Sequence, residues 1–459
     1  MKYISTRGQV PPAEFQAAVM MGLADDGGLI IPQEIPNVAD RLADWAALSY
    51  ADLAYEIIKL FATDIPPPDL RDLIDRAYSP TSFDPAPAEL VKAGDLWVLE
   101  LWHGPTLSFK DIALQLLGNL FEYILARQGG RLNILAATSG DTGSAAIYGV
   151  RGRKNIDIFV MHPAGRVSPL QERQMTAVLD ANVHNIAIDG SFDDCQRIMK
   201  TLAGDREFKR TWSIGAVNSV NWARVLAQIV YYFYAAFAVQ RATGRRGVRF
   251  AVPTGNFGDV LAGWYAMQMG LPIRQLGLAT NENDILSRFF NSGLYTSGPV
   301  AVTLSPAMDI QVASNFERYL FYRAGRDANR LRGLMDAFGA TGMLAIEPGD
   351  DGLVDGAFFA GVGDTAASLA AIRKYHERYG YLLDPHTAVG VCVAESAGLA
   401  GDPMVCLSTA HPAKFPDAIE QATGKKGLAR QASLDALSGL PTRCEKLPND
   451  PEAVRNFII

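Results

Sequence analysis

Lys110 lies in a segment of apolar and small residues that reads L-W-H-G-P-T-L-S-F-K-D from Leu101 to Asp111. The apolar residues on both sides predict a loop that enters a largely buried helix near Ser108. Burial disfavours an ammonium ion and lowers its pKa, which suits an amine that attacks a carbonyl to form a Schiff base. The alternative is a lysine that reaches solvent from the helix start or pairs with Asp111, and the segment taken alone favours that simpler interpretation.

Two other segments place glycine and short polar residues between an expected strand and an expected helix. T-S-G-D-T-G-S-A-A begins at Thr138, after the strand 132–137, and T-G-N-F-G-D begins at Thr254, after the strand 248–253. Glycine lets backbone N–H groups approach a phosphate closely, and the helix N-terminus adds the positive end of its dipole. We therefore predict a phosphate cradle at 254–259, without nucleotide hydrolysis because the G-K-[ST] ending is absent.

In the first of these loops the candidate anion ligands are Ser139, Thr142 and the backbone amides around Gly140 and Gly143. A capped strand-to-helix turn with Asp141 near the N-cap explains the same residues equally well. Both interpretations stay open at the level of the sequence.

A second candidate anion site lies in V-N-S-V-N-W-A-R at 217–224, which places Asn218, Ser219 and Arg224 within two turns of an expected helix start. Arginine can grip a phosphate or carboxylate at two points, and asparagines offer neutral donors beside it. The alternative is an asparagine-capped helix with a surface arginine.

Thr409 follows the expected strand 404–407 and opens T-A-H-P-A-K-F. The carboxyl end of a strand is where open α/β sheets bind ligands, so its hydroxyl is placed to meet a ring nitrogen. A threonine that merely ends a strand is the alternative. The six histidines show no metal-ligand spacing, and neither H-E-x-x-H nor G-x-S-x-G occurs.

Alternating strand and helix patterns from Asp95 onward predict an α/β fold that would position these residues. Residues 1–95 carry short helical patterns and predict a mostly helical lead domain. The remaining chain, 96–459, is expected to form the core, with a large subdomain of 96–130 and 240–459 and a small subdomain of 131–239. A length of 459 residues and 49% hydrophobic composition suffice for such a multidomain protein.

Charge and composition point to a small ligand. The net charge of -7 and a pI of about 5.5 argue against nucleic acid and anionic membranes as partners. The longest apolar run, 225–239, is too short to cross a bilayer and predicts a core helix. The absence of an apolar leader and the scattered cysteines predict a cytoplasmic protein with reduced thiols.

Six motifs in order resemble the threonine synthases, which are fold type II, tryptophan synthase beta-like enzymes that use pyridoxal 5'-phosphate. They are Y-I-S-T-R-G, H-G-P-T-L-S-F-K-D, A-T-S-G-D-T-G-S-A-A, N-S-V-N-W-A-R, P-T-G-N-F-G-D and S-T-A-H-P-A-K-F, and they span nearly the whole chain. The resemblance implies a two-domain core behind the lead domain. It also implies that Lys110 binds the cofactor covalently and that Thr409 meets the pyridine nitrogen.

The same resemblance assigns the remaining site residues. It implies a cradle for the cofactor phosphate, made by Gly255, Asn256, Phe257, Gly258 and Asp259. Asp141 stands where many fold type II enzymes have an asparagine that faces the ring, which looks like the N-terminally extended branch of the family. Residue chemistry and the resemblance together give our candidates for substrate binding, which are Ser139, Gly140, Asp141, Thr142, Asn218, Ser219 and Arg224. Of these, Ser139, Gly140 and Thr142 would hold the substrate's carboxylate or share its phosphate.

The reaction implied by the resemblance converts O-phospho-L-homoserine and water into L-threonine and phosphate, by γ-elimination of phosphate and β-addition of water. Arg224 with Asn218 and Ser219 is our candidate for the leaving phosphate, and Lys414 and Arg7 are the next candidates. We expect a monomer or dimer, without a nucleic-acid or membrane partner.

Two alternatives remain. Another fold type II lyase, such as a threonine dehydratase or cysteine synthase, would need neither the lead domain nor the second anion site. A non-catalytic sensor with the same fold would not need Lys110 and both glycine loops intact.

Overall fold

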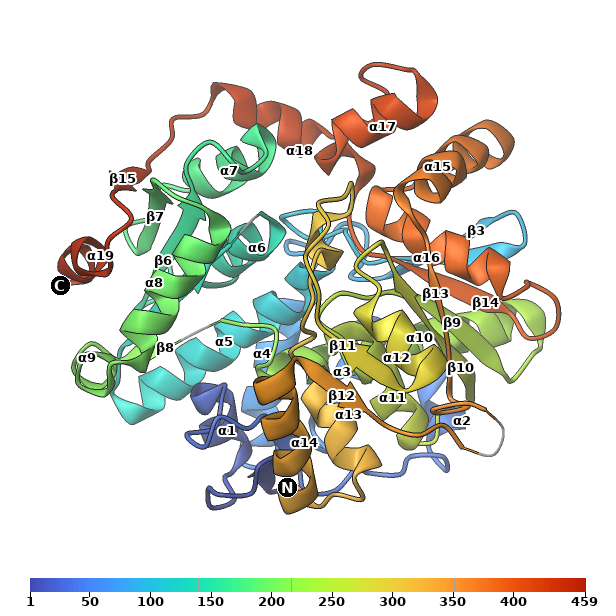
Figure 1. The fold of residues 1–459 in the computed structure, drawn as a ribbon, viewed down its shortest axis with the longest axis horizontal. Coiled ribbons are helices and arrows are strands. Elements are labelled where there is room, and N and C mark those ends of the chain that lie inside the picture. The colour runs from blue at the N-terminus through green and yellow to red at the C-terminus, as the bar shows by residue number, and fades with distance from the viewer. Residues whose placement is uncertain (139, 216, 350–351) are drawn as a thin grey trace.

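The computed structural model of the chain describes residues 1–138, 140–215, 217–349 and 352–459. Within these residues most strands belong to two sheets, which lie on opposite sides of the molecule in Figure 1. We call them the larger sheet and the smaller sheet.

The larger sheet is parallel except at one edge, where β3 and β4 form an antiparallel pair. Its strands are rich in buried apolar residues because helices cover both faces of such a sheet. Its order is β13 (Phe358–Val362), β10 (Ile273–Thr280), β9 (Val248–Pro253), β14 (Met404–Ser408), β4 (Leu96–Glu100) and β3 (Glu89–Ala93).

The smaller sheet is parallel throughout its described pairs. Its order is β15 (Glu445–Leu447), β7 (Val183–Ile188), β6 (Ile156–Pro163), β5 (Leu132–Ala137) and β8 (Ile214–Gly215). β15 departs from our prediction, which placed all of 240–459 with the large subdomain. The chain returns to the smaller sheet there because α19 buries Val454 and Ile458 in the apolar cluster of that sheet.

The helices of the core surround these sheets, and the antiparallel pair of β11 (Leu294–Thr296) and β12 (Met343–Ala345) lies outside them. The helices are α5 (Lys110–Gln128), α6 (Asp141–Val150), α7 (Pro169–Thr176), α8 (Phe192–Gly204), α9 (Arg206–Thr211), α10 (Trp222–Thr243), α11 (Gly258–Gln268), α12 (Ile285–Ser292), α13 (Phe316–Arg323), α14 (Ala328–Thr341), α15 (Thr365–Tyr379), α16 (Pro385–Ser396), α17 (Pro416–Thr423), α18 (Ala432–Asp435) and α19 (Pro451–Ile458), with short 3-10 turns η1 (Pro306–Met308), η2 (Pro412–Lys414) and η3 (Ala436–Gly439).

α5 and α10 pack against each other in the interior and begin at the two segments that carry Lys110 and Arg224. α10 is long and apolar enough to cross a membrane by length and composition, but 89% of that apolar window is buried inside the fold. A helix that is apolar on all sides and covered by protein is typical of a core.

Residues 1–95, all of which the structure describes, combine helices with a short antiparallel ladder of β1 (Tyr3–Ser5) and β2 (Ile30–Pro32) and end in β3. Their helices are α1 (Phe15–Met21), α2 (Leu42–Trp45), α3 (Tyr50–Ile58) and α4 (Pro67–Ala77). α3 packs on α10, and α4 packs on α5, so the lead segment covers the two helices that reach the candidate site.

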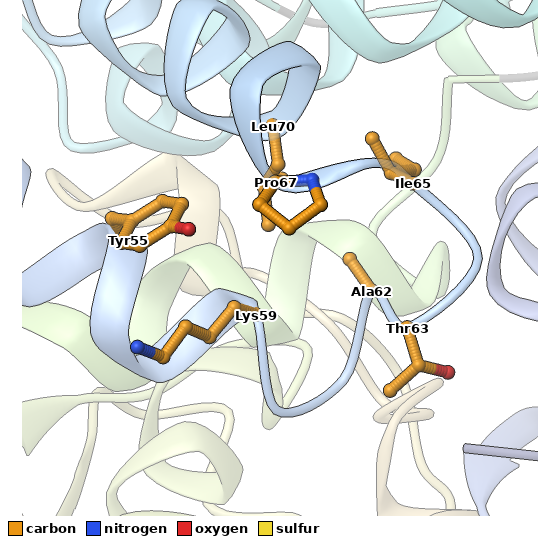
Figure 2. Close-up of a pocket in the computed structure, with 7 residues that line it drawn as sticks. All are labelled: Tyr55, Lys59, Ala62, Thr63, Ile65, Pro67 and Leu70. Carbon is orange, nitrogen blue, oxygen red and sulfur yellow. The ribbon is translucent and has the colours of Figure 1, made fainter.

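A pocket of about 290 Å³ opens between α3 and α4, and Figure 2 shows its seven lining residues. Lys59 and Tyr55 lie on one side of it, while Ile65, Pro67 and Leu70 lie on another. All of the lining comes from residues 55–70, so this pocket is separate from the predicted site residues.

Candidate active site

The loops that follow three neighbouring strands of the larger sheet meet at one edge. β14 pairs in parallel with β4 on one side and with β9 on the other, so their carboxyl ends point the same way. The backbone N–H of Phe109 donates to the carbonyl of Thr409 at 2.9 Å. The loop with Lys110 therefore lies directly against the loop with Thr409, at the edge where α/β sheets bind ligands.

Lys110 is the first residue of α5 and is buried. Burial lowers the pKa of its amine, the positive charges of Lys414 and Arg224 lower it further, and Asp141 acts in the opposite direction. The distance from Nζ of Lys110 to Oδ2 of Asp141 is 3.7 Å. A lysine that reached solvent was the simpler expectation for this position, and the structure excludes it.

Asp111, the other partner that we considered for Lys110, instead stabilises the loop before it. Its carboxylate accepts hydrogen bonds from the hydroxyl of Thr106 at 2.7 Å and from the backbone N–H of Thr106 at 2.8 Å. Burial raises the pKa of Asp111 to about 6, and the bonds from Thr106 oppose that shift. Gly104 is required here because a Cβ atom would lie 2.5 Å from Cβ of Asp111.

In the loop between β5 and α6, a side chain of the loop itself accepts hydrogen bonds from two of the backbone N–H groups. Oγ1 of Thr138 accepts from the backbone N–H groups of Gly140 at 3.1 Å and Gly143 at 2.9 Å. Those two amides, which we expected to face an anion, are therefore satisfied internally. Ser139 lies outside the described residues, and in the described part of the loop the N–H groups of Asp141 and Thr142 donate to no acceptor.

Asp141 itself faces two lysines across the site. Oδ1 of Asp141 lies 2.9 Å from Nζ of Lys414 and accepts a hydrogen bond of 2.9 Å from Nε2 of Gln171. Burial alone would raise the pKa of Asp141, but Lys414 and Lys110 hold it well below its usual value. Sequence reasoning gave Lys414 only as a reserve candidate for the leaving phosphate and missed Gln171, because their meeting with Asp141 is purely tertiary.

The loop between β9 and α11 is arranged differently. The backbone N–H groups of residues 255–259 donate to no acceptor within the described structure. A Cβ atom on Gly255 would lie 2.6 Å from the carbonyl oxygen of Ala307. The loop is a cradle of free donors that admits no side chain at Gly255, in the position that a phosphate requires.

Phe257 and Asp259 anchor this cradle through their side chains. Phe257 takes a left-handed backbone conformation with φ of 65° and buries its ring among other aromatic rings, including Phe290 at 5.9 Å. Oδ1 of Asp259 accepts hydrogen bonds from the hydroxyls of Tyr231 and Tyr232. Burial raises the pKa of Asp259 to about 6. The side chain of Asp259 thus faces the core, and only its backbone N–H remains for a phosphate.

Arg224 lies in the first turn of α10 and is buried, with burial lowering the pKa of its guanidinium to about 10. Its Nη1 atom and the Oδ1 atom of Asn218 are buried without a hydrogen-bond partner among the described residues. A buried cation without an acidic partner is costly unless a ligand supplies the anion. This observation favours an anion site over a surface arginine.

Asn315 connects this segment with the cradle. Its backbone N–H donates to the carbonyl of Asn256 at 3.1 Å, and its side-chain amide donates to the carbonyl of Ser219 at 3.1 Å. The neighbouring Arg318 donates to the carbonyls of Val220 and Ile30, the latter in β2. The second anion site, the cradle and the lead segment are therefore joined through one turn, which sequence reasoning did not identify.

Arg7, our other reserve candidate for the leaving phosphate, pairs with Glu317 at 3.1 Å. Thr6 also donates to Glu317 at 2.7 Å. The S-T-R-G segment therefore fixes the start of α13, and Arg7 already has an acidic partner.

Comparison with families and known proteins covers the whole chain. Residues 2–78 match the model described as threonine synthase N terminus, residues 74–348 that of pyridoxal-phosphate dependent enzymes, and residues 387–458 that of threonine synthase, C-terminal. The threonine synthase of Pseudomonas aeruginosa is 46% identical over 100% of this chain and 98% of its own. The chain belongs to the threonine synthase family. The enzyme of that name from Saccharomyces cerevisiae is also 46% identical, over 92% of this chain and 88% of its own.

Solved structures confirm the fold class predicted from the sequence. A threonine synthase from Brucella melitensis with bound pyridoxal phosphate superposes with a TM-score of 0.95, at 46% identity, over 100% of this chain and 98% of its own. The threonine synthase of Escherichia coli gives a TM-score of 0.84 at 30% identity, over 100% of this chain and 99% of its own. A threonine deaminase from Solanum lycopersicum, with a TM-score of 0.52 at 11% identity, shares the fold alone.

The cofactor of the family, pyridoxal phosphate, fits the residues present. It needs a buried amine, a phosphate cradle without steric obstruction, and a partner for its ring nitrogen. Lys110, the free N–H groups of 255–259 and the hydroxyl of Thr409 supply these groups at one edge of the larger sheet. When bound, the cofactor withdraws electrons from a substrate carbon that loses a proton.

Proposed function

We propose that this protein converts O-phospho-L-homoserine and water into L-threonine and phosphate. The observation that carries the proposal is Arg224, a buried guanidinium without an acidic partner among the described residues. The cradle at 255–259 already offers donors for the cofactor phosphate. The substrate carries a second phosphate, which leaves in the reaction. That phosphate is the anion that the buried guanidinium of Arg224 would bind.

Lys110 is the catalytic residue of the proposal. It holds the cofactor covalently, and its lowered pKa keeps a larger fraction of the free amine neutral. A neutral amine at this position can take a proton from the substrate's Cα and return it later. The nearby carboxylate of Asp141 stabilises the ammonium form when Lys110 holds that proton.

Arg224, Asn218 and Ser219 bind the substrate's phosphate in this proposal, and the guanidinium stabilises the charge that grows as the phosphate leaves. The N–H groups of Asp141 and Thr142 at the start of α6, which donate to no acceptor in the described part of the loop, bind the substrate's carboxylate in this proposal. Gly255, Asn256, Phe257, Gly258 and Asp259 hold the cofactor phosphate through their backbone. Thr409 meets the ring nitrogen with a neutral hydroxyl.

The domain division into a lead domain of 1–95, a large subdomain and a small subdomain of 131–239 is part of the proposal, with 445–458 reassigned to the smaller sheet. We also propose that the enzyme acts in the cytoplasm as a monomer or dimer. All four cysteines are free thiols, which suits a reducing compartment.

The decisive measurement is phosphate release from O-phospho-L-homoserine with identification of the amino-acid product. Lys110→Ala should abolish turnover because it removes the covalent attachment and the proton carrier together. Circular dichroism should show an unchanged fold. Threonine formation by this variant at a substantial rate, without an added amine, would contradict the assignment of Lys110.

Arg224→Ala tests the phosphate site separately. We expect the variant to lose about 2–4 kcal/mol of transition-state stabilisation for phosphohomoserine, measured from the ratio of kcat/KM values. Cofactor binding should be retained. Arg224→Lys should recover only part of the loss, because an ammonium lacks the planar two-point contact. Arg241→Ala, at the other end of α10, is the matched control and should behave as wild type.

The loss at Arg224 should be selective. Deamination of serine or threonine, which carry no phosphate, should be nearly unaffected by Arg224→Ala. Equal losses on both kinds of substrate would show that Arg224 supports the fold or binds the carboxylate. Turnover of serine or threonine alone, without phosphate release from phosphohomoserine, would favour a deaminating lyase instead.

A further inference from the structure

Asp141 has one carboxylate oxygen that is fully occupied and one that is free. Oδ1 is held by Lys414 at 2.9 Å and by Gln171 at 2.9 Å. Oδ2 accepts no hydrogen bond in the part of the chain that the structure describes, and it lies 3.7 Å from Nζ of Lys110. The free oxygen therefore faces the amine to which the cofactor is attached.

Lys414 is suited to a positioning role because its side chain is fully buried and its other contact is fixed. Its Nζ atom donates to the carbonyl of Thr106 at 2.6 Å. Thr106 is itself held by Asp111 through two hydrogen bonds. The ammonium thus has one defined position between a rigid loop and Asp141, and its charge compensates that of the buried carboxylate.

The position of the free oxygen suggests its partner. In pyridoxal phosphate the ring hydroxyl is on the carbon next to the one that bears the aldehyde, so it lies beside the lysine nitrogen after attachment. Oδ2 of Asp141 lies on that nitrogen's side of the carboxylate. A carboxylate can only accept a hydrogen bond, whereas an amide could also donate one.

We propose that Lys414 and Gln171 hold the Asp141 carboxylate so that its free oxygen accepts a hydrogen bond from the ring hydroxyl of bound pyridoxal phosphate, with Lys414 as a positioning residue. The ring oxygen then keeps its proton instead of carrying a negative charge. This inference rests on the cofactor assignment within the proposed function, but it is independent of the substrate.

Several charged groups act on this arrangement. Around Lys110 they are Asp141, Lys414, Arg224 and Asp111, and His386 from α16 also acts on Asp141. Among these groups, the carboxylate of Asp141 forms the ion pair with the amine of Lys110, with Oδ2 at 3.7 Å from Nζ. Its substitution should therefore have the largest effect on protonation at that nitrogen.

The experiment is an absorbance titration of the holoenzyme against pH without substrate, because the visible band of the lysine–cofactor linkage changes when it loses its proton. A neighbouring carboxylate favours the protonated linkage, so Asp141→Asn should lower the midpoint by about 1 unit or more. Asn is isosteric with Asp, so the variant should fold. A midpoint that stays unchanged in Asp141→Asn would overturn the proposal.

Lys414→Met tests the positioning role. If Lys414 acts through Asp141, this substitution should move the midpoint by at least about half a unit in the wild-type background and by much less in the Asp141→Asn background. Equal shifts in both backgrounds, or no shift in either, would contradict the role. If Lys414→Met does not fold, the same titrations are made with Lys414→Gln.

The matched control is Lys426→Met, which removes an ammonium whose side chain is 87% exposed. Its midpoint should equal that of wild type. If the enzyme did not turn over O-phospho-L-homoserine, these titrations would still test the proposal, because they require only bound pyridoxal phosphate. Failure of the wild-type protein to bind the cofactor would instead refute the cofactor assignment on which both proposals rest.

Discussion

The two glycine loops of this protein look alike in sequence, yet they differ in what they leave free. Each follows a strand, contains two glycines and leads into a helix with an aspartate in its first turn. In the loop before α11 the N–H groups of 255–259 have no acceptor in the described structure. In the loop before α6, Thr138 accepts from two of the amides.

The aspartates in the first turns of these two helices, Asp141 and Asp259, also differ in their surroundings and in their pKa shifts. Asp141 faces Lys414 and Lys110, which hold its pKa down against the effect of burial. Asp259 faces two tyrosine hydroxyls, and burial raises its pKa to about 6. One loop therefore offers free backbone N–H groups, while the other places a negative charge beside the amine of Lys110. The side chains that face each aspartate decide this difference, and they come from distant parts of the chain.

The largest effect should come from Gly255→Val, which fills the cradle. The new side chain would collide with the carbonyl of Ala307, so the loop must shift and its N–H groups lose their common direction. We expect the affinity for pyridoxal phosphate to fall about 100-fold or more, measured by fluorescence titration of the apoprotein. Gly204→Ala, at a glycine whose added Cβ would meet no atom within 4 Å, is the control. If Gly255→Val kept full cofactor occupancy after dialysis, the loop 255–259 would not be the phosphate cradle.

Asp259→Asn should change how stability depends on pH. A carboxyl with a pKa raised from 3.8 to about 6 contributes stability that is complete below pH 4 and is lost as the pH rises through 6. The loss is on the order of 2–3 kcal/mol at neutral pH. Urea unfolding between pH 4 and 7 should show this decline in wild type and a flatter profile in Asp259→Asn. The same decline in both proteins would assign it to another group.

Asp141 should give the opposite trend, because a lowered pKa contributes stability that is present above the unfolded value and is lost as the pH falls. Comparing Asp141→Asn with Asp259→Asn over the same pH series therefore sharpens the contrast between the loops.

Thr138→Val should have the smallest of these effects. It keeps the shape of the side chain but leaves the N–H of Gly140 without its acceptor and weakens the bonding of Gly143. We expect a loss of about 1–2 kcal/mol in the free energy of unfolding, measured in urea. Thr142→Val is the control, since the Thr142 hydroxyl bonds to no described residue, and it should change stability by less than about 0.5 kcal/mol. A Thr138→Val protein as stable as its control would mean that water or a rearranged loop replaces the hydroxyl.

The strands, helices and glycine loops of the core could be predicted because they depend on local patterns. The apolar runs before Thr138 and Thr254 form β5 and β9, and the helices after them begin at Asp141 and Gly258. The apolar neighbours of Lys110 indicated a largely buried helix, but the segment taken alone did not decide whether the amine itself is buried. Resemblance to a known family then supplied roles that spacing alone could not.

What could not be predicted depends on contacts between segments far apart in the chain. No local signal shows that the hydroxyl of Thr138 uses two amides of its loop, or that Lys414 and Gln171 meet at Asp141. The return of β15 to the smaller sheet was missed for the same reason, because a strand of three residues carries almost no pattern. Sequence reasoning was therefore reliable for elements and weak for the partners of polar side chains.

The contacts that assemble the site have a consequence for how the protein is made. Trp102 donates a hydrogen bond to Ser408, which lies 306 residues later in the sequence. Lys414 donates one to Thr106, which lies 308 residues earlier. During translation the segment with Lys110 leaves the ribosome long before residues 408–414 exist. The amine and the loop of Lys110 must therefore remain without these neighbours until residues 408–414 are synthesised, and the loop after β9 must remain so until the neighbouring strand β14 is synthesised. Cofactor capture should accordingly be a late, post-translational event, and a ribosome-bound chain that stops before residue 404 should not retain pyridoxal phosphate.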